Sequence, residues 1–299
     1  MPSLRSGAAA ALLVPVFAGA VGGQVEPELT VAMTARAMQP GEVVRIDVSC
    51  SCSKPLGRVR ATVFSKDIEF APAGSSWQAL VGIDLETRAR QYALKIDATG
   101  QGMPPLTAAR TLRVAARTFP TRRLRVAPEF VEPPPDALER IALENERIAS
   151  LIQIVSARHW DGVFLTPVAP TITSDFGTRT LFNGQPRAPH LGVDLAGETG
   201  TPVKAPSGGR IALADNFYLT GNTLIIDHGQ GLYSLLAHLS RFAVDPGADI
   251  TAGAVVGFVG ATGRVTGPHL HWSTRLNGAR VNPMSLVELG APAAPASAR

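Results

Sequence analysis

Between residues 25 and 116, apolar and polar positions alternate with the two-residue period of β-strands. Residues 43–48, 59–64 and 92–97 each place apolar side chains on one face, and clusters rich in Gly, Pro and Ser, such as 71–76, separate such runs. Several short strands at this spacing predict a small β-sandwich of immunoglobulin-like type over residues 25–116. No cluster of titratable side chains marks this region as catalytic, which favours a spacer or targeting role.

A helical period follows three prolines at 133–135. Asp136 is a candidate N-cap, with Glu139 as its reciprocal partner three residues later. Apolar residues then fall near one helical stripe up to about residue 158: Leu138, Ile141, Ile148, Ile152 and Val155. Residues 117–160 are therefore predicted to form a Pro-rich linker and a connector helix that packs against one or both flanking domains.

From Trp160 onward the pattern is again that of strands, with many glycines between them. The candidate strands are 202–205, 209–214, 223–227, 232–238, 255–259 and 269–276. No helical period intervenes before residue 283. We therefore expect an antiparallel β domain over residues 161–290, a flexible tail at 291–299, and a mainly β protein as a whole.

Composition and charge narrow the class of protein. The chain has 299 residues, enough for two domains, and a net charge of only +4 with no run of Lys and Arg, which argues against nucleic-acid binding.

Residues 1–20 have the pattern of a cleaved signal peptide, with Arg5, the apolar stretch 8–19 and the small residues Ala18-Gly19-Ala20. That stretch is too short to span a bilayer and contains Pro15. We expect a monomer located outside the cytoplasm, in the periplasm or secreted, without a membrane span.

Cys50 and Cys52 are the only cysteines, and one residue separates them. Their side chains would have to approach closely to form a bridge. A strained disulfide and free thiols both remain open, and zinc ligation by this pair lacks the further ligands that a structural site needs.

Five of the six histidines lie between residues 190 and 271. His269 and His271 project from one face of a predicted strand, with Leu270 and Trp272 on the other. His190 and Asp194 form a second constellation, and His238 ends another predicted strand. Two histidines, one aspartate and an open position satisfy the needs of a catalytic zinc site.

Three ordered motifs resemble the lysostaphin-type (LytM-type) zinc metallopeptidases. They are His190-x-x-x-Asp194, Ala237-His238-Leu239-Ser240 and Thr262-Gly263-x-x-Thr266-Gly267-Pro268-His269-Leu270-His271. The resemblance covers roughly residues 167–287 and includes Phe176-Gly177-Thr178-Arg179 and Gly200-Thr201-Pro202-Val203.

The resemblance implies a role for each matched residue. His190, Asp194 and His271 take the positions of the zinc ligands, His269 that of the general base and His238 that of the second catalytic histidine. It also implies a Zn²⁺-dependent endopeptidase that cuts peptide bonds in the stems or cross-links of peptidoglycan. In one departure from the family pattern, Leu236-Ala237 precedes His238 where many relatives have an aromatic residue.

Two alternatives remain beside the active enzyme. The same fold could serve as a catalytically silent regulator that binds the cell wall, or the N-terminal domain or connector could shield the cleft of a latent enzyme.

Among the other polar residues, His228 is expected at a hairpin turn and His159 in a surface or packing role. Asn183, Asn216 and Tyr218 are expected in loops that either border the cleft or have no contact with substrate. The bond that is cut does not follow from the sequence.

Overall fold

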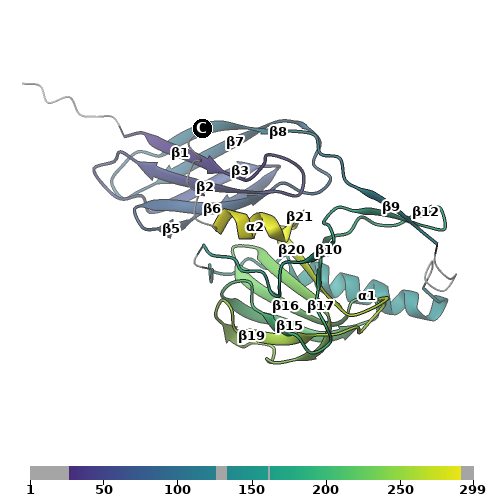
Figure 1. The fold of residues 1–299 in the computed structure, drawn as a ribbon. Coiled ribbons are helices and arrows are strands. Elements are labelled where there is room, and N and C mark those ends of the chain that lie inside the picture. The colour runs from purple at the N-terminus through teal and green to yellow at the C-terminus, as the bar shows by residue number, and fades with distance from the viewer. Residues whose placement is uncertain (1–26, 126–132, 161, 291–299) are drawn as a thin grey trace, which may run out of the picture.

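The computed structural model describes residues 27–125, 133–160 and 162–290. The predicted signal peptide (1–20) and tail (291–299) lie outside these residues. Along the chain follow two N-terminal sheets, a helix and a larger sheet, so the prediction of a mainly β protein is confirmed (Figure 1). No helix in the described ranges has both the length and the apolar character needed to cross a membrane.

Eight strands between residues 29 and 114 form two antiparallel sheets of four strands each. The first has the order β1-β2-β6-β5, with bounds Leu29–Thr34, Val43–Cys50, Ser76–Gly82 and Ala71–Ala73. The second has the order β4-β3-β7-β8, with bounds Lys66–Glu69, Arg58–Val63, Arg90–Thr99 and Leu106–Val114. The predicted runs 43–48 and 92–97 lie within β2 and β7, and the run 59–64 extends one residue beyond the end of β3.

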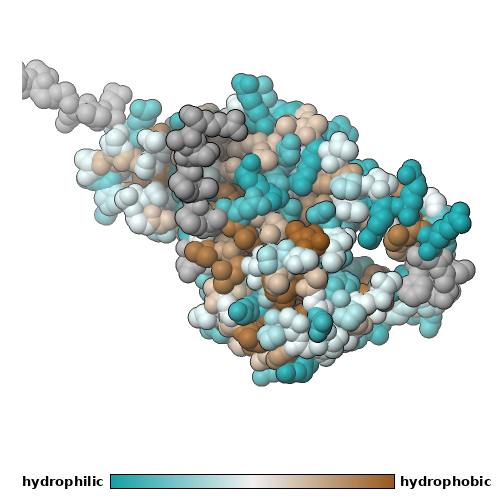
Figure 2. All heavy atoms as spheres, in the orientation of Figure 1, coloured by the Kyte–Doolittle hydropathy of each residue, from teal (hydrophilic) through white to brown (hydrophobic). Residues whose placement is uncertain are grey.

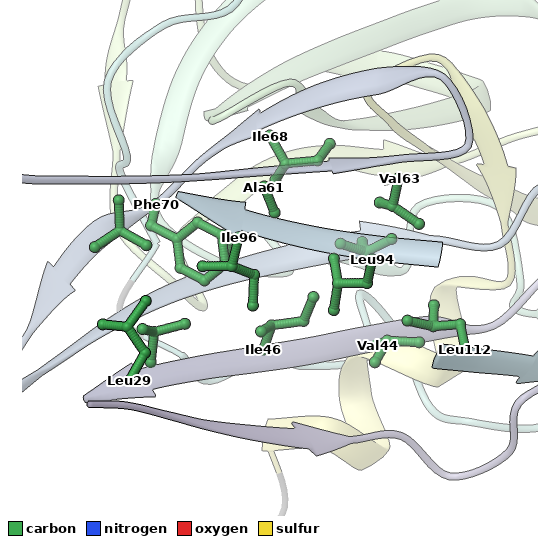
Figure 3. Packing of buried hydrophobic residues seen from close by; sticks show 14 of the residues in the cluster. Leu29, Val44, Ile46, Ala61, Val63, Ile68, Phe70, Leu94, Ile96 and Leu112 are labelled. Atoms are coloured by element: carbon green, nitrogen blue, oxygen red, sulfur yellow. The ribbon is translucent and has the colours of Figure 1, made fainter. Parts of the chain in front are cut away.

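The apolar residues of these alternating runs meet between the two sheets (Figure 3). Ile46 comes from the first sheet and Leu94 and Ile96 from the second, and all three are fully buried. Burying a side chain of this size contributes ~1.5–3 kcal/mol. The N-terminal sheets therefore have a hydrophobic core of their own.

The C-terminal part is a ten-stranded antiparallel sheet. Its main path is β10-β13-β20-β17-β16-β15-β18, with bounds Ile172–Ser174, Gly192–Ala196, His269–Leu276, Leu232–Phe242, Gly221–Gly229, Gly209–Phe217 and Asp249–Ile250. The remaining strands are β14 (Pro202–Lys204), β19 (Val255–Val259) and β21 (Ala279–Val281). The predicted bounds are confirmed for β19 and β20, and β15, β16 and β17 are longer than predicted.

A fourth, three-stranded sheet contains a strand from the predicted linker. Its order is β12-β11-β9, with bounds Gln185–Pro186, Arg179–Phe182 and Thr121–Leu124. β9 runs parallel to β11. The chain therefore pairs with the C-terminal part before it enters the helix, a pairing that the sequence pattern did not predict.

Helix α1 (Pro135–Leu151) confirms the predicted connector helix but begins and ends elsewhere. The predicted Asp136 cap is wrong: Pro134 is the N-cap, without a side-chain hydrogen bond. Pro135 takes the first helical position, which suits proline because a backbone N–H would have no partner within the helix there. The helix stops before residue 158 because the following segment hydrogen-bonds to β16 and to the turn after it. His159 N–H donates to His228 O, and Gln230 N–H donates to Ser156 O, both at 2.9 Å.

Helix α1 packs on the outside of the large sheet through its last turns. Ile148 and Ile152 contact a buried cluster that includes Phe217. Leu138 and Val155, expected in the same stripe, are 52% and 62% exposed. The predicted apolar stripe is therefore correct only for its central part.

Helix α2 (Pro283–Gly290) joins the N-terminal sheets to the C-terminal sheet (Figure 1). Val43 N–H donates to Ser285 Oγ at 2.9 Å. Beside the helix, Arg280 binds Asp84 with two side-chain hydrogen bonds of 2.6 and 3.0 Å. At Gly82 a Cβ atom would lie only 2.9 Å from Val281, so the two parts are in close contact.

Cys50 and Cys52 form a disulfide at the end of β2. The structure thus selects the bonded form among the possibilities that the sequence left open.

His228 belongs to the interior of the large sheet and lies in β16, not in a hairpin turn as expected. Its Nδ1–H donates to Gly208 O at 2.7 Å, and its Nε2 accepts from Ser234 Oγ at 2.9 Å. Ser234 Oγ in turn accepts from Trp272 Nε1 at 3.2 Å. Both ring nitrogens are engaged in the neutral state, so His228 is a structural residue, and burial lowers its pKa to about 4.

We predict that His228 makes the fold sensitive to acid. Because the pKa in the folded state lies below the unfolded value of 6.5, the unfolded chain is protonated first as the pH falls. The contribution of neutral His228 to the free energy of unfolding is complete above pH 6.5 and is lost as the pH falls toward 4. Between pH 6.5 and pH 5 the free energy of unfolding should fall by about 2 kcal/mol. Urea unfolding at both pH values should show a smaller loss in His228→Gln than in the wild type. Equal losses would contradict this assignment.

Candidate functional site

Two neighbouring strands bring the predicted site residues together. Asp194 lies in β13, His269 and His271 lie in β20, and His190 directly precedes β13. Asp194 and His271 are cross-strand partners in the antiparallel register. Directly opposite side chains start from Cβ atoms ~5 Å apart, so the sheet itself sets this contact.

His190, Asp194 and His271, which we call the His-Asp-His trio, point three ligand atoms at one point. His190 Nε2 lies 3.0 Å from both Asp194 Oδ1 and His271 Nδ1, and the latter two atoms are 2.9 Å apart. Ligands at 2.0–2.1 Å from a tetrahedral zinc ion lie roughly 3.3 Å from one another. The trio therefore has nearly the spacing of a zinc ligand set, and its three residues could hold a metal ion.

The protonation states of the trio suit a cation. Burial alone would raise the pKa of Asp194, but its hydrogen bonds and electrostatic interactions with His190 and His271 outweigh burial and lower that pKa well below its usual range. Burial lowers the pKa of His271. A carboxylate beside imidazoles offers lone pairs to a metal at neutral pH.

Backbone carbonyls fix the orientation of three of the four histidine rings in the cleft. In each ring Nδ1–H donates to a carbonyl oxygen, and these pairs are His190 with Asp175 (3.0 Å), His238 with Thr262 (3.0 Å) and His269 with Gly267 (2.9 Å). In a neutral imidazole the other nitrogen, Nε2, then carries the lone pair. Such partners of ligand histidines set the tautomer and hold the ring.

His238 reaches the same cleft from β17. Its ring centroid is 4.9 Å from that of His269 and 6.0 Å from that of His271. The residue has a positive φ of 63°, a conformation that is uncommon outside glycine and often found at functional sites. Burial lowers the pKa of His238 to about 4, with a further contribution from His271.

Thr262 holds the loop that orients His238. Its Oγ1 accepts from Asn222 N (2.9 Å) and donates to Leu239 O (2.8 Å). At Gly263, which has a φ of 78°, a Cβ would lie 2.3 Å from Gly221 N. The loop at Gly263 can approach the start of β16 at Gly221 this closely only because both residues are glycine.

The cleft around these residues has a volume of about 450 Å³. It is lined by Arg122, Leu124, Phe182, His190, Asp194, Leu219, Thr220, His238, Arg264, Val265, Thr266, His269 and His271. All five residues to which the sequence assigned a metal or catalytic role are thus in one cleft. Arg122 and Leu124 come from β9 and were missed, because no local motif links a linker strand to a site beyond the helix.

Helix α1 fixes the hairpin next to the cleft. Glu144 accepts from Tyr218 N at 2.8 Å, and Arg147 pairs with Asp215 at 2.5 Å. Leu219 and Thr220, which follow Tyr218, line the cleft, and Thr220 O accepts from His238 N at 2.9 Å. Tyr218 itself does not line the cleft and contacts the helix instead.

Three kinds of comparison with known proteins agree on the C-terminal part. Residues 188–283 match the model of Peptidase family M23. The DD-carboxypeptidase/endopeptidase Mpg of Neisseria meningitidis serogroup B is 46% identical over 97 residues, which are 32% of this chain and 22% of Mpg. The peptidoglycan DD-endopeptidase ShyA of Vibrio cholerae is 40% identical over 114 residues, 38% of this chain and 26% of ShyA. The chain thus matches about a quarter of the length of these curated relatives.

A solved structure matches much more of the chain. A Pseudomonas aeruginosa protein assigned to peptidase M23 aligns with a TM-score of 0.65 and 29% identity, over 85% of this chain and 96% of that one. The fold similarity therefore includes much of the N-terminal part as well. Together with the motifs and the geometry of the trio, these matches place the C-terminal region of the chain, residues 188–283, in peptidase family M23, the lysostaphin- or LytM-type family.

Proposed function

We propose that this protein is a zinc-dependent endopeptidase that hydrolyses peptide bonds in the stems or cross-links of peptidoglycan. The observation that carries the proposal is the convergence of three ligand atoms within 3.0 Å, with His238 and His269 in the same cleft. Family membership and the relatives whose names describe DD-endopeptidases support the same reaction and substrate.

His190, Asp194 and His271 would hold the Zn²⁺ ion. Two neutral imidazoles and one carboxylate leave a net charge of +1 and an open position, as in catalytic zinc sites. When bound, zinc polarises the scissile carbonyl and makes hydroxide available at neutral pH. The trio is 15–19% exposed at its side chains, so solvent and substrate can reach it.

His269 is the proposed general base. Its Nδ1–H is bound to Gly267 O, so the lone pair of Nε2 is directed toward the trio, and Nε2 lies 3.7 Å from Asp194 Oδ1. Nε2 can therefore accept a proton from the attacking water and pass it to the leaving amine.

His238 is the proposed second catalytic histidine, with a restriction that its hydrogen bond imposes. Because Nδ1–H donates to Thr262 O, the neutral ring presents only a lone pair at Nε2. His238 can stabilise an oxyanion only after it has taken up a proton during the reaction. The sequence had left open whether this ring is protonated or acts as a neutral donor.

The catalytically silent regulator is less well supported. Such a protein would be expected to lack a ligand or a base, whereas all five positions are filled here. The latent enzyme is not favoured either, because the described residues leave the trio partly exposed. The relative ShyA, whose name describes a peptidoglycan DD-endopeptidase, supports the proposal that the protein works outside the cytoplasm. The removal of residues 1–20 is proposed from their signal-peptide pattern alone.

We also propose that residues 25–116 form an immunoglobulin-like domain, residues 117–160 a linker with its helix, and residues 161–290 the peptidase domain. The strand orders β1-β2-β6-β5 and β4-β3-β7-β8 support the first assignment, since immunoglobulin-like sandwiches divide their strands between two antiparallel sheets in this manner.

Loss of a metal ligand should remove both zinc and activity. We expect the purified wild type to contain about one zinc ion per chain, because the spacing of the trio suits a zinc site. Asp194→Ala and His271→Ala should lose most of the metal and lower peptidoglycan cleavage by at least ~10²-fold. His159→Ala, at an exposed histidine outside the cleft, is the matched control. Full zinc content in His271→Ala would contradict the ligand assignment.

Loss of the base should leave zinc in place. His269→Ala is expected to lower kcat by ~10²–10⁴-fold, and His238→Ala by ~10²–10³-fold, at unchanged zinc content. Metal analysis combined with the release of soluble muropeptides separates this outcome from loss of the ion. Activity close to that of the wild type in His269→Ala would exclude its role as the base.

A further inference from the structure

Strand β9 brings Arg122 into the cleft from outside the region that matches family M23. The strand is held by its backbone: Arg179 N–H donates to Pro120 O (2.8 Å) and Asn183 N–H donates to Leu124 O (3.0 Å). The side chain of Arg122 is therefore not needed to keep the strand in place. Its position in the cleft calls for a different explanation.

The guanidinium of Arg122 is available for a ligand. The side chain is exposed and makes no hydrogen bond or ion pair with any other described residue. Of the described residues that line the cleft, Asp194 alone is acidic, and it already accepts from His190 and His271. Arg122 thus faces a cleft with no unengaged carboxylate of the protein.

The surroundings of β9 are hydrophilic, while the cleft wall beside Arg122 is apolar. On the visible face, hydrophilic side chains gather over the region of β9 and β12 (Figure 2). Leu124 and Phe182, cross-strand partners in β9 and β11, both line the cleft. An arginine beside an apolar wall suits a short peptide with alkyl side chains and a free carboxylate, which a guanidinium can bind through two parallel hydrogen bonds.

We propose that Arg122 is a specificity-determining residue that binds a free carboxylate of the peptide substrate. The cleft then prefers acidic stem peptides to the same peptides in which that carboxylate is amidated. This inference rests on the proposed function and deepens it by naming the class of substrate.

The strand supplies a matched control. Neighbouring residues of a strand point to opposite faces. Arg122 and Leu124 line the cleft, whereas Arg123, between them, is exposed and does not. Arg123→Gln changes the net charge of the protein by the same amount as Arg122→Gln on the same strand.

The test compares cross-linked muropeptide dimers with free stem carboxylates and the same dimers with carboxamides. The wild type should cleave the acidic dimer with a higher kcat/KM, by roughly 10-fold or more, as expected for a charge-assisted hydrogen bond. Arg122→Gln should lose this preference through a higher KM for the acidic dimer, with little change for the amidated one. Arg122→Lys should keep part of the preference, and Arg123→Gln all of it.

A second readout measures binding of both dimers to zinc-loaded His269→Ala, alone and combined with Arg122→Gln. If the acidic dimer binds more tightly and this difference depends on Arg122, the inference is supported. Failure of the wild type to cleave either dimer would refute the proposed endopeptidase function, but it would not refute this role of Arg122. Equal cleavage and equal binding of the two dimers would leave the endopeptidase intact and overturn the role of Arg122. An equal loss for both dimers in Arg122→Gln would also overturn it.

Discussion

The site depends on one cross-strand contact, that between Asp194 and His271. The antiparallel register of β13 and β20 places the two residues opposite each other, and the pairing of Ala237 with His271 in β17 continues the same row. The neighbouring residues Trp272 and Leu195 point to the opposite face of the sheet, where both are fully buried at 0% exposure. A shift of one residue in either strand would turn the ligands into the core and the core residues into the cleft, so packing and ligand geometry enforce the same register.

The sequence singles out five residues that the structure brings into one cleft, and it can do so because their pattern is local. His269 and His271 share a strand face, His190 and Asp194 are separated by one short stretch, and flanking glycines mark the turns. The predicted bounds of β20 are confirmed for the same reason: partly buried and buried positions alternate along the strand, with buried Ser273 as the one exception. Patterns of this kind depend on the period of a single strand and need no knowledge of distant contacts.

Features that depend on distant partners were missed or only partly predicted. β9 has four residues, three of them polar, and becomes a strand only because β11 is available to pair with it. Helix α1 ends at Leu151 because the next segment bonds to β16 and the turn after it. Its charged side chains at Glu144 and Arg147 contact the hairpin between β15 and β16, a contact that the sequence pattern did not predict. Tertiary contacts override local propensity at each of these places.

The parallel pairing of β9 with β11 also affects how the molecule is assembled. Residues 121–124 are synthesised before residues 179–182, and helix α1 lies between them in the sequence. A ribosome-bound chain can complete the N-terminal sheets early, but one side of the cleft forms only when residues 179–182 pair with residues 121–124. Contacts between such distant segments form slowly because the loop between them has to be closed first. Strand β20 is synthesised later still, so the three residues of the His-Asp-His trio can come together only near the end of synthesis.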